Sequence, residues 1–410
     1  MVIGPRNVRY FWHFTTLIKK HHTSILELVI KSGALVLEAI CTLRTVFRAN
    51  FTKEAVTMKG YAVLAPGEHG WLEREKPTAG PMDAVVRPIA VAPCSSDTHT
   101  MHMGSTTGSP VILGHEAVAE VVEVGALVRG LRPGDIVVVP CVTPDWEAPA
   151  LQQRGANNAH DYASMASFKY LTQKDGVFAE FFHVNNADAN LVLLPKDVSV
   201  DAALMTVDMM STGFYGAEMA DIQLGDTVVV FGIGPVGLMA VAGARLRGAG
   251  RIIGIGTRPN CAELAREYGA TDIVSYKDGD VVQQILELEG GKVDRAILAG
   301  GDASTLNQAL SVVKSNGVVS NVTFLDPTDT YHIPAPLWGL GMSDISIRGG
   351  FCPGGAYRIQ KMLRLIQNGR VAPEKMLNYQ YDGFDKIPEA FVAMDQKPRD
   401  LIKPVVHIQW

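Results

Sequence analysis

The sequence has few cysteines for its length, and they are widely separated. Its five cysteines, an odd number, are spread over 410 residues. This spacing argues against a disulfide framework and favours a reducing compartment. Because no C-x-x-C pair occurs, we do not expect a closed structural zinc site built from four cysteines.

The sequence also lacks an excess of basic charge and any long apolar run. Charged residues make up 19% of the chain and the formal net charge is -5, whereas a nucleic-acid surface normally shows a clustered basic face. No apolar run reaches the roughly 18 residues that a transmembrane helix needs. We therefore predict no nucleic-acid partner and no membrane span. With 47% hydrophobic residues, the chain is long enough for about two domains.

The first 57 residues differ in composition from the rest. They carry eight Lys and Arg against three acidic residues, a net charge of +5. Apolar stretches within 25–37 allow an amphipathic helix, and a basic, acid-poor start is typical of an organelle transit peptide. The simpler interpretation is an unstructured extension or wrongly joined upstream sequence, because Met58 opens a clean strand pattern. We favour that interpretation and a cytoplasmic protein, with a mitochondrion-related organelle as the alternative.

Two kinds of pattern follow Met58. Up to about Val142, short β-runs separated by Gly and Pro predict a β-rich module with a site in its loops. From about Ser211, strands alternate with helices, which predicts a doubly wound parallel sheet, and mixed structure returns after about Phe351. Residues 143–175 are polar and suggest a long functional loop. The predicted α/β architecture is a β-rich catalytic domain at 58–211, completed by 352–410, and a Rossmann domain at 212–351.

The segment Gly232–Gly237 fits the pattern G-x-G-x-x-G. It follows a buried strand at 227–231 and precedes a helix expected at 238–247, which is the context that dinucleotide binding requires. Gly232 allows the tight turn, Gly234 lets the backbone approach the pyrophosphate, and Gly237 lets helix and strand pack closely. The helix N-terminus then offers free N–H groups to the phosphates. A plain strand-to-helix turn is the alternative.

The end of the next strand indicates which coenzyme is bound. NAD sites usually carry an acidic residue about 20 residues further on, which binds the ribose 2′-hydroxyl. Here Gly256 takes that place, followed by Thr257 and Arg258. A small residue, a hydroxyl and a guanidinium would accept a 2′-phosphate, which a carboxylate would repel. We therefore predict NADP(H); the alternative is that Arg258 is only a solvated loop residue.

Three segments before this domain carry candidate metal ligands. They contribute Cys94, the adjacent His115 and Glu116, and Asp208 within an apolar stretch. Each has an ordinary explanation, as a small buried cysteine, a structural histidine or a helix cap. Together they supply Cys, His and Asp, with Glu116 as a fourth candidate. A catalytic zinc takes three protein ligands and keeps one position open.

Several motifs of the chain from Met58 to Trp410 resemble the zinc-containing medium-chain alcohol dehydrogenases. The resemblance is greatest to the NADP-dependent secondary-alcohol dehydrogenases of anaerobic bacteria and protists. The motifs are Ala92-Pro-Cys-Ser-Ser-Asp97, Ile112-Leu-Gly-His-Glu116, Thr143-Pro-Asp-Trp146, Asp208-Met-Met210, Gly232–Gly237 and, in modified form, Arg348-Gly-Gly-Phe-Cys-Pro-Gly-Gly355. The resemblance implies a GroES-like catalytic domain interrupted by a Rossmann domain. It also implies a homotetramer with one catalytic zinc per subunit and no structural zinc.

The resemblance also implies roles for individual residues. The zinc ligands would be Cys94, His115 and Asp208, with Glu116 binding or exchanging at the metal. The residues implied to line the NADP site are Ile233, Gly234, Pro235, Val236, Gly256, Thr257, Arg258, Tyr276 and Lys397, with Val322 and Phe324 near the nicotinamide. We further expect Ser96 and His99 to relay the substrate proton towards water. We expect Trp146 to wall the alcohol pocket, with an ordinary loop anchor as the alternative.

The expected activity is a zinc-dependent interconversion of small secondary, and less well primary, alcohols with ketones or aldehydes, using NADP(H). One alternative is a zinc-free quinone reductase on the same fold, which is disfavoured because all the expected ligand positions are filled. A polyol dehydrogenase would favour NAD and an acid after the second strand. A non-catalytic protein that keeps the fold is a third alternative, and it predicts degraded ligand residues, which the sequence does not show.

Overall fold

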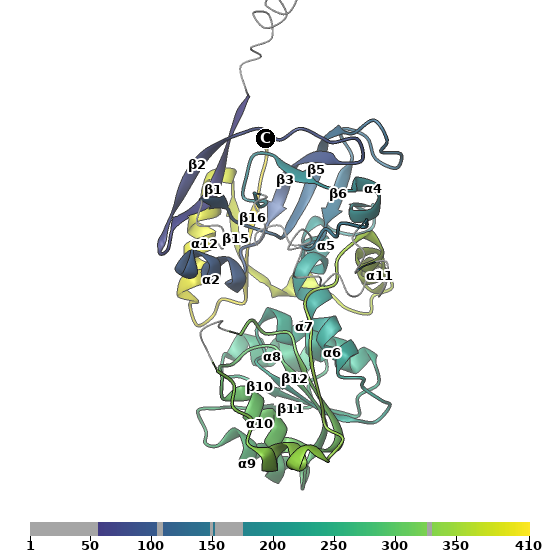
Figure 1. Ribbon diagram of the computed structural model, residues 1–410, viewed down its shortest axis with the longest axis vertical. Helices are drawn as coiled ribbons and strands as arrows, with labels where there is room; N and C mark the ends of the chain where they lie inside the picture. Colours follow the sequence, from purple (N-terminus) through teal and green to yellow (C-terminus); the bar gives the residue numbers. More distant parts are fainter. Residues whose placement is uncertain (1–55, 105–109, 148–150, 152–174, 326–329) are drawn as a thin grey trace, which may run out of the picture. The chain divides into compact units, whose positions relative to one another are not determined.

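The computed structural model describes residues 56–104, 110–147, 151, 175–325 and 330–410. Residues 57–410 form one compact unit that contains three sheets (Figure 1). The apolar stretches within 25–37 and most of the expected loop at 143–175 lie outside the described residues. Among the described helices, none is both long and apolar enough to cross a bilayer.

The six-stranded sheet is parallel throughout and has the strand order β11-β10-β9-β12-β13-β14. Its strands are β9 (Thr227–Phe231), β10 (Arg251–Ile255), β11 (Asp272–Val274), β12 (Val293–Leu298), β13 (Val313–Asn321) and β14 (Ser346–Gly349). Numbered along the chain, this is the 3-2-1-4-5-6 order of the dinucleotide-binding fold. Every residue of β9 is buried, as expected of a central strand covered on both faces. The strand order reverses between β9 and β12, so a crevice is expected at their carboxyl ends.

Helix α6 (Ser211–Met219) precedes the first strand of this sheet, and further helices connect its strands. The connecting helices are α7 (Pro235–Leu246), α8 (Pro259–Tyr268), α9 (Val281–Glu289), α10 (Thr305–Val312) and the 3₁₀ helix η3 (Ala335–Gly341). The sequence placed the start of α7 at 238, but the helix begins three residues earlier, with Gly234 as its N-cap and Pro235 at its first position. Proline suits that position because its missing N–H would have no helical partner.

The β-rich part contains a seven-stranded and a three-stranded sheet. The larger sheet comprises β3 (Ala84–Val91), β5 (Ala117–Val124), β6 (Ile136–Val139), β7 (Phe182–Val184), β8 (Val192–Leu193), β15 (Leu377–Asp382) and β16 (Lys403–His407). The smaller comprises β1 (Thr57–Ala65), β2 (Glu68–Glu75) and β4 (Val111–Ile112). Strand β16 pairs with β3, so the end of the chain completes the sheet that begins before the Rossmann segment. The predicted fold class is confirmed, while the limits 58–211, 212–351 and 352–410 stay a prediction.

The remaining helices flank these sheets. They are α2 (Ser95–Met103), α4 (Ala187–Asn190), α5 (Val200–Met205), α11 (Ala356–Gln367), α12 (Ile387–Gln396), the π-helix η2 (Thr206–Met210) and the 3₁₀ helices η4 (Pro373–Met376) and η5 (Phe384–Lys386). The π-helical turn η2 joins α5 directly to α6. Such turns are rare in proteins overall, but those that occur are often found at functional sites. This one carries Asp208.

Candidate active site

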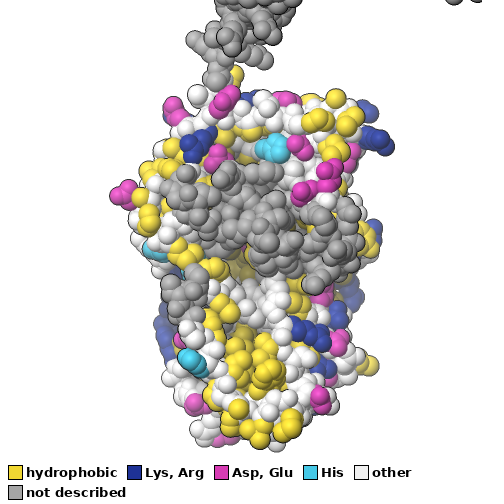
Figure 2. Space-filling view, in the orientation of Figure 1, with side chains coloured by type: hydrophobic (Ala, Val, Ile, Leu, Met, Phe, Trp, Pro, Cys, Tyr) yellow, Lys and Arg dark blue, Asp and Glu magenta, His cyan; other side chains and the backbone are white. Residues whose placement is uncertain are grey.

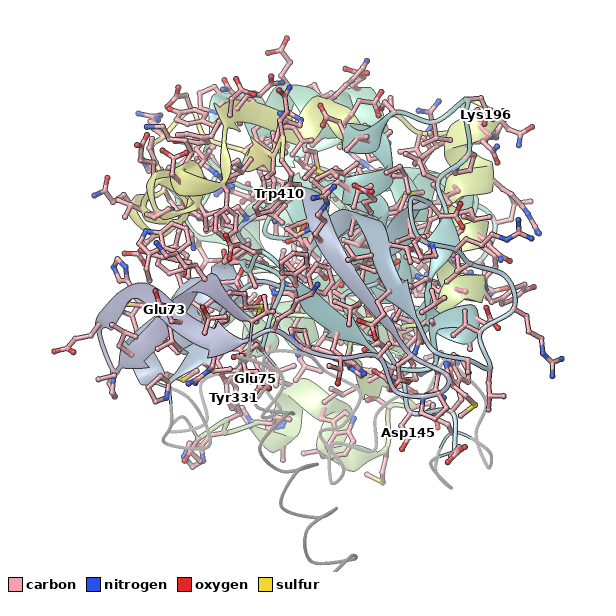
Figure 3. The ribbon with its side chains drawn as sticks, turned by 90° about the horizontal axis from the view of Figure 1, so that it is seen from above. Glu73, Glu75, Asp145, Lys196, Tyr331 and Trp410 are labelled. Atoms are coloured by element: carbon pink, nitrogen blue, oxygen red, sulfur yellow. The ribbon has the colours of Figure 1, made fainter. Side chains whose placement is uncertain are left out.

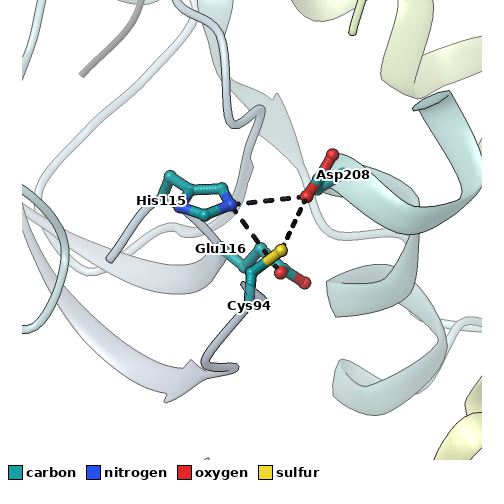
Figure 4. A group of neighbouring side chains, drawn as sticks. All are labelled: Cys94, His115, Glu116 and Asp208. Carbon is teal, nitrogen blue, oxygen red and sulfur yellow. Dashed lines mark hydrogen bonds and ion pairs between the residues drawn. The ribbon is translucent and has the colours of Figure 1, made fainter. Parts of the chain in front are cut away.

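Four side chains predicted to bind metal come together at one point (Figure 4). Cys94 caps the N-terminus of α2, His115 and Glu116 immediately precede β5, and Asp208 lies on η2. Each offers one ligand atom, and these atoms lie within 4.8 Å of one another. The Asp208 Oδ2 atom is 3.3 Å from His115 Nε2 and 3.7 Å from Cys94 Sγ. His115 and Asp208 are 93 residues apart in the chain, yet their side chains meet here.

Two further residues orient this cluster, and the sequence analysis did not identify either. Asp97 Oδ1 lies 3.2 Å from His115 Nδ1, and Asp97 Oδ2 accepts the Cys94 N–H at 2.9 Å. A carboxylate on the far nitrogen of a ligating histidine fixes its tautomer and ring orientation. Thr212 donates to Asp208 Oδ1 at 2.6 Å, which leaves Oδ2 directed towards the other ligands. Asp97 lies three residues after Cys94, at the position where an acid can cap the start of a helix. This spacing was the available sequence signal for its role.

The cluster has an excess of negative charge. Burial alone would lower the pKa of His115, but the charge of Asp97 and hydrogen bonds with Asp208 and Asp97 raise it well above its usual value. Burial alone would raise the pKa of Asp208, but hydrogen bonds from His115 and Thr212 lower it overall. The site therefore attracts positive charge, which a divalent metal supplies.

Glu116 is fully buried behind the other three ligands and faces a buried lysine. Lys403 Nζ donates to Glu116 Oε1 at 2.5 Å and to the Pro93 carbonyl at 2.9 Å. Burial raises the pKa of Glu116 to about 7, although the charge of Lys403 opposes this. The other carboxylate oxygen, Glu116 Oε2, is buried with no hydrogen-bond partner. No local sequence signal identified Lys403, which lies 287 residues from Glu116.

These residues fit a zinc ion. A thiolate, an imidazole and a carboxylate are the donors that catalytic zinc sites use, and three such ligands leave a fourth position for substrate. The unpartnered Glu116 Oε2 atom adds a buried acceptor that a cation would satisfy.

Ser96 and His99 lie on the same face of α2, because they are three residues apart in a helix. The Ser96 hydroxyl is 3.2 Å from Cys94 Sγ and 3.4 Å from His115 Nε2. The His99 ring stacks on Phe324, with 5.4 Å between ring centroids. A hydroxyl at the metal cluster and an imidazole one helical turn away are the groups that a proton relay needs.

The glycine-rich turn has the geometry of a phosphate cradle. Gly232 has a φ of +86°, and a Cβ there would lie 2.8 Å from the Gly300 Cα. A Cβ on Gly237 would lie 1.7 Å from the Gly232 carbonyl oxygen. Both contacts are with backbone atoms. The clash caused by a side chain at either position could therefore not be relieved by a rotamer change. The N-terminus of α7 therefore stays open to an anionic group.

The residues expected at the 2′-phosphate also lie together. Thr257 donates to the Tyr276 hydroxyl at 2.9 Å, and Arg258 Nη1 donates to the Leu401 carbonyl at 2.5 Å. Arg258 Nη2 lies 3.4 Å from where a Cβ on Gly234 would be, which places the guanidinium over the glycine-rich turn. A Cβ on Gly256 would lie 2.4 Å from Ile233 Cγ1. Ile233 therefore occupies part of the space that the acidic side chain of an NAD site would take at position 256.

One cavity of about 1600 Å³ contains both groups of residues. That volume exceeds the 300–1,000 Å³ typical of a small-molecule pocket and suits a dinucleotide with a small substrate. The predicted residues that line it are Cys94, Ser96, His99, His115, Asp208, Gly232, Ile233, Gly234, Pro235, Val236, Gly256, Thr257, Arg258, Tyr276, Val322, Phe324 and Lys397.

Three predicted residues are not among the described residues that line the cavity: Glu116, Gly237 and Trp146. Glu116 lies behind the metal ligands, and Gly237 packs against the turn. The Trp146 Nε1 atom donates to Asn190 at 3.0 Å, and the neighbouring Asp145 lies towards the periphery in Figure 3. A loop anchor accounts for these contacts, and a role of Trp146 in the alcohol pocket stays a prediction.

A Rossmann sheet whose phosphate cradle shares a cavity with a Cys/His/acid cluster defines a metal-dependent dinucleotide oxidoreductase. Two family models match the chain: the alcohol dehydrogenase GroES-like domain at residues 80–196 and the zinc-binding dehydrogenase at residues 235–368. The chain belongs to the zinc-containing alcohol dehydrogenase family.

Curated relatives match most of the chain. An NADP-dependent isopropanol dehydrogenase of Thermoanaerobacter brockii is 54% identical over 85% of this chain and 99% of its own length. Enzymes of the same description from Clostridium beijerinckii and Entamoeba histolytica are 52% and 49% identical, over 85% and 86% of this chain and 99% and 97% of their own lengths.

Solved structures support the fold. An alcohol dehydrogenase from Thermus sp. ATN1 matches with a TM-score of 0.73 and 28% identity, over 86% of this chain and 100% of that one. A zinc-dependent alcohol dehydrogenase from a Streptococcus species matches with a TM-score of 0.77 and 26% identity, over 86% of this chain and 99% of that one.

Proposed function

We propose that this protein is a zinc-dependent oxidoreductase that interconverts small secondary alcohols and ketones with NADP+ and NADPH, and primary alcohols and aldehydes less well. The observation that carries this proposal is the shared cavity, which contains the metal cluster and the dinucleotide cradle. The relatives described as NADP-dependent isopropanol dehydrogenases support the substrate class.

Cys94, His115 and Asp208 hold the zinc, with Glu116 as an additional or exchanging ligand. Zinc, when bound, supplies Lewis acidity that polarises the substrate oxygen. Asp97 and Thr212 keep His115 and Asp208 in position through the hydrogen bonds described above.

The chain's own groups handle the proton and the coenzyme. Ser96, whose hydroxyl lies beside Cys94 and His115, accepts the substrate proton while passing its own towards His99. The turn at 232–237 binds the pyrophosphate. The 2′-phosphate is bound by Thr257, Arg258, Tyr276 and Lys397, and Gly256 presents no carboxylate that would repel it. Val322 and Phe324 line the cavity on the nicotinamide side.

A combined measurement tests the proposal. Zinc content and propan-2-ol-dependent reduction of NADP+ are measured on the same preparation, before and after chelation. We expect zinc and activity to fall together and to return together on adding zinc. Full activity after complete zinc removal would favour the zinc-free quinone reductase.

We further propose a single zinc per subunit. The described residues contain a second cluster of candidate ligands, Cys141, Asp208 and Cys352. Because it shares Asp208 with the first cluster, the two compete for one ligand. Metal analysis by mass spectrometry of the native subunit counts the ions directly.

We also propose a homotetramer. Strand β14 is an edge of the six-stranded sheet, and an edge strand invites pairing with another chain. Near it in sequence, Leu340 and Met342 are 65% and 78% exposed, and Figure 2 shows hydrophobic side chains gathered on the coenzyme-binding part. Light scattering of the purified protein tests this.

The proposed location is the cytoplasm, with a mitochondrion-related organelle as the alternative if residues 1–57 are a transit peptide. Mass spectrometry of the mature N-terminus distinguishes the two.

A further inference from the structure

Lys403 occupies an unusual position for a lysine. Its side chain is completely buried, at the first residue of β16. Its ammonium donates to the carbonyl of Pro93, the residue before Cys94. It also donates to Oε1 of Glu116, the residue after His115. One cation therefore joins the two segments that present Cys94 and His115.

Burying an ammonium group is strongly unfavourable unless close partners compensate for its lost hydration. The compensation here is the negative charge of the cluster. A zinc-bound Cys94 thiolate, Asp208 and Glu116 carry three negative charges, and the buried Asp97 beside His115 carries a fourth. A divalent metal balances two of these charges, and Lys403 balances one more.

The two oxygens of Glu116 have different surroundings. Lys403 holds Oε1 at 2.5 Å, while Oε2 has no partner. Glu116 Oε1 is also 3.9 Å from His115 Nε2, so the carboxylate is close to the other ligand atoms. A carboxylate in this position could be held by either of two cations, the ammonium or a bound metal.

We propose that Lys403 is a positioning residue that holds Glu116 back from permanent ligation of the zinc and thereby keeps the fourth zinc position open for substrate. This inference rests on the proposed zinc site. Without the ammonium, the buried carboxylate would have the metal as its remaining cationic partner. Glu116 would then bind zinc continuously and compete with the alcohol.

The test is zinc release from the purified full-length protein into a chelator that reports metal binding by its colour. In Lys403→Met, we expect zinc release to slow by about tenfold or more, the scale on which residues that orient metal ligands change metal affinity. The KM for propan-2-ol should rise while the dissociation constant for NADPH stays unchanged. A purely structural role for Lys403 predicts the opposite, because a loosened site loses zinc faster.

Two further variants complete the test. In Lys403→Met/Glu116→Gln, which removes both buried charges, zinc release and KM should return towards wild-type values. In Glu116→Gln alone, zinc release should change by less than about threefold, because Lys403 already holds Glu116 off the metal. Lys386→Met is the matched control, since Lys386 forms a 2.5 Å pair with Glu389 at the surface.

Faster zinc release from Lys403→Met would overturn the proposal. So would zinc release at least tenfold faster from Glu116→Gln, which would make Glu116 a resident ligand; this second result holds even if Lys403→Met fails to fold. Absence of zinc from the wild-type protein would instead reject the proposed function itself.

Discussion

The substitution Arg258→Ala tests the coenzyme preference directly. Arg258 lies over the glycine-rich turn and lines the cavity together with Thr257. Hydrogen bonds to charged groups contribute roughly 1.5–3 kcal/mol each. Since 1.4 kcal/mol corresponds to a factor of ten, the dissociation constant for NADPH should rise by roughly 10- to 150-fold.

Arg258 also makes a hydrogen bond that does not involve the coenzyme. Arg258 Nη1 also donates to the Leu401 carbonyl, so alanine removes a link to the C-terminal segment as well as a phosphate partner. That loss affects NADPH and NADH equally, because it does not involve the 2′-phosphate. The ratio of the two dissociation constants therefore isolates the phosphate contact.

Fluorescence titration of the reduced coenzymes measures both constants. The NADPH constant should rise as stated, and the NADH constant should change by less than about threefold. Arg266→Ala is the matched control, since Arg266 is an exposed arginine of α8, the helix for which Arg258 is the N-cap residue. Equal weakening of NADPH and NADH by Arg258→Ala would refute the assignment of Arg258 to the 2′-phosphate.

Three other perturbations have defined outcomes. Asp208→Ala should reduce zinc affinity by at least about 100-fold and abolish activity with it; a zinc-replete, active variant would remove Asp208 from the ligand set. Ser96→Ala should lower kcat for alcohol oxidation by about 100-fold or more with NADPH binding intact, and unchanged turnover would exclude Ser96 from the relay. Zinc removal by a chelator should lower the melting temperature, because a ligand bound only to the folded state stabilises it by about 4 kcal/mol at 1,000 times its Kd; an unchanged melting temperature in calorimetry would contradict a metal held by the folded site.

The sequence predicted the strand and the glycine-rich turn of the coenzyme-binding part closely because their signals are local. The strand at 227–231, the glycines after it and Pro235 lie within a dozen residues. Together they build the turn between this strand and the helix that follows it. The alternation of strands and helices predicted a parallel sheet, which the structure confirms. The start of α7 was misplaced, because the expected start at 238 ignored the preference of proline for the first turn.

The metal site was predictable only as a set of separate candidates. Cys94, His115 and Asp208 come from distant segments, and nothing in their local patterns shows that they meet. Their supporting groups were harder still. Lys403 lies on β16, the second strand from the edge of its sheet, and the sequence of this strand has no unusual feature. Lysine is almost never fully buried unless it is paired, so burial of Lys403 was not expected. The pairing with Glu116 is a product of the tertiary fold and has no short-range signature.

The coenzyme preference is a property of packing as much as of charge. The absence of a side chain at 256 leaves space that Ile233 occupies, with its Cγ1 atom 2.4 Å from the place of a Cβ. An acid at 256 would therefore have to displace Ile233, a residue of the phosphate-binding turn itself. Because Ile233 is 3% exposed and interiors are closely packed, that displacement would disturb the pyrophosphate cradle. The turn and the strand end thus favour NADP(H) together, and neither position determines the preference alone.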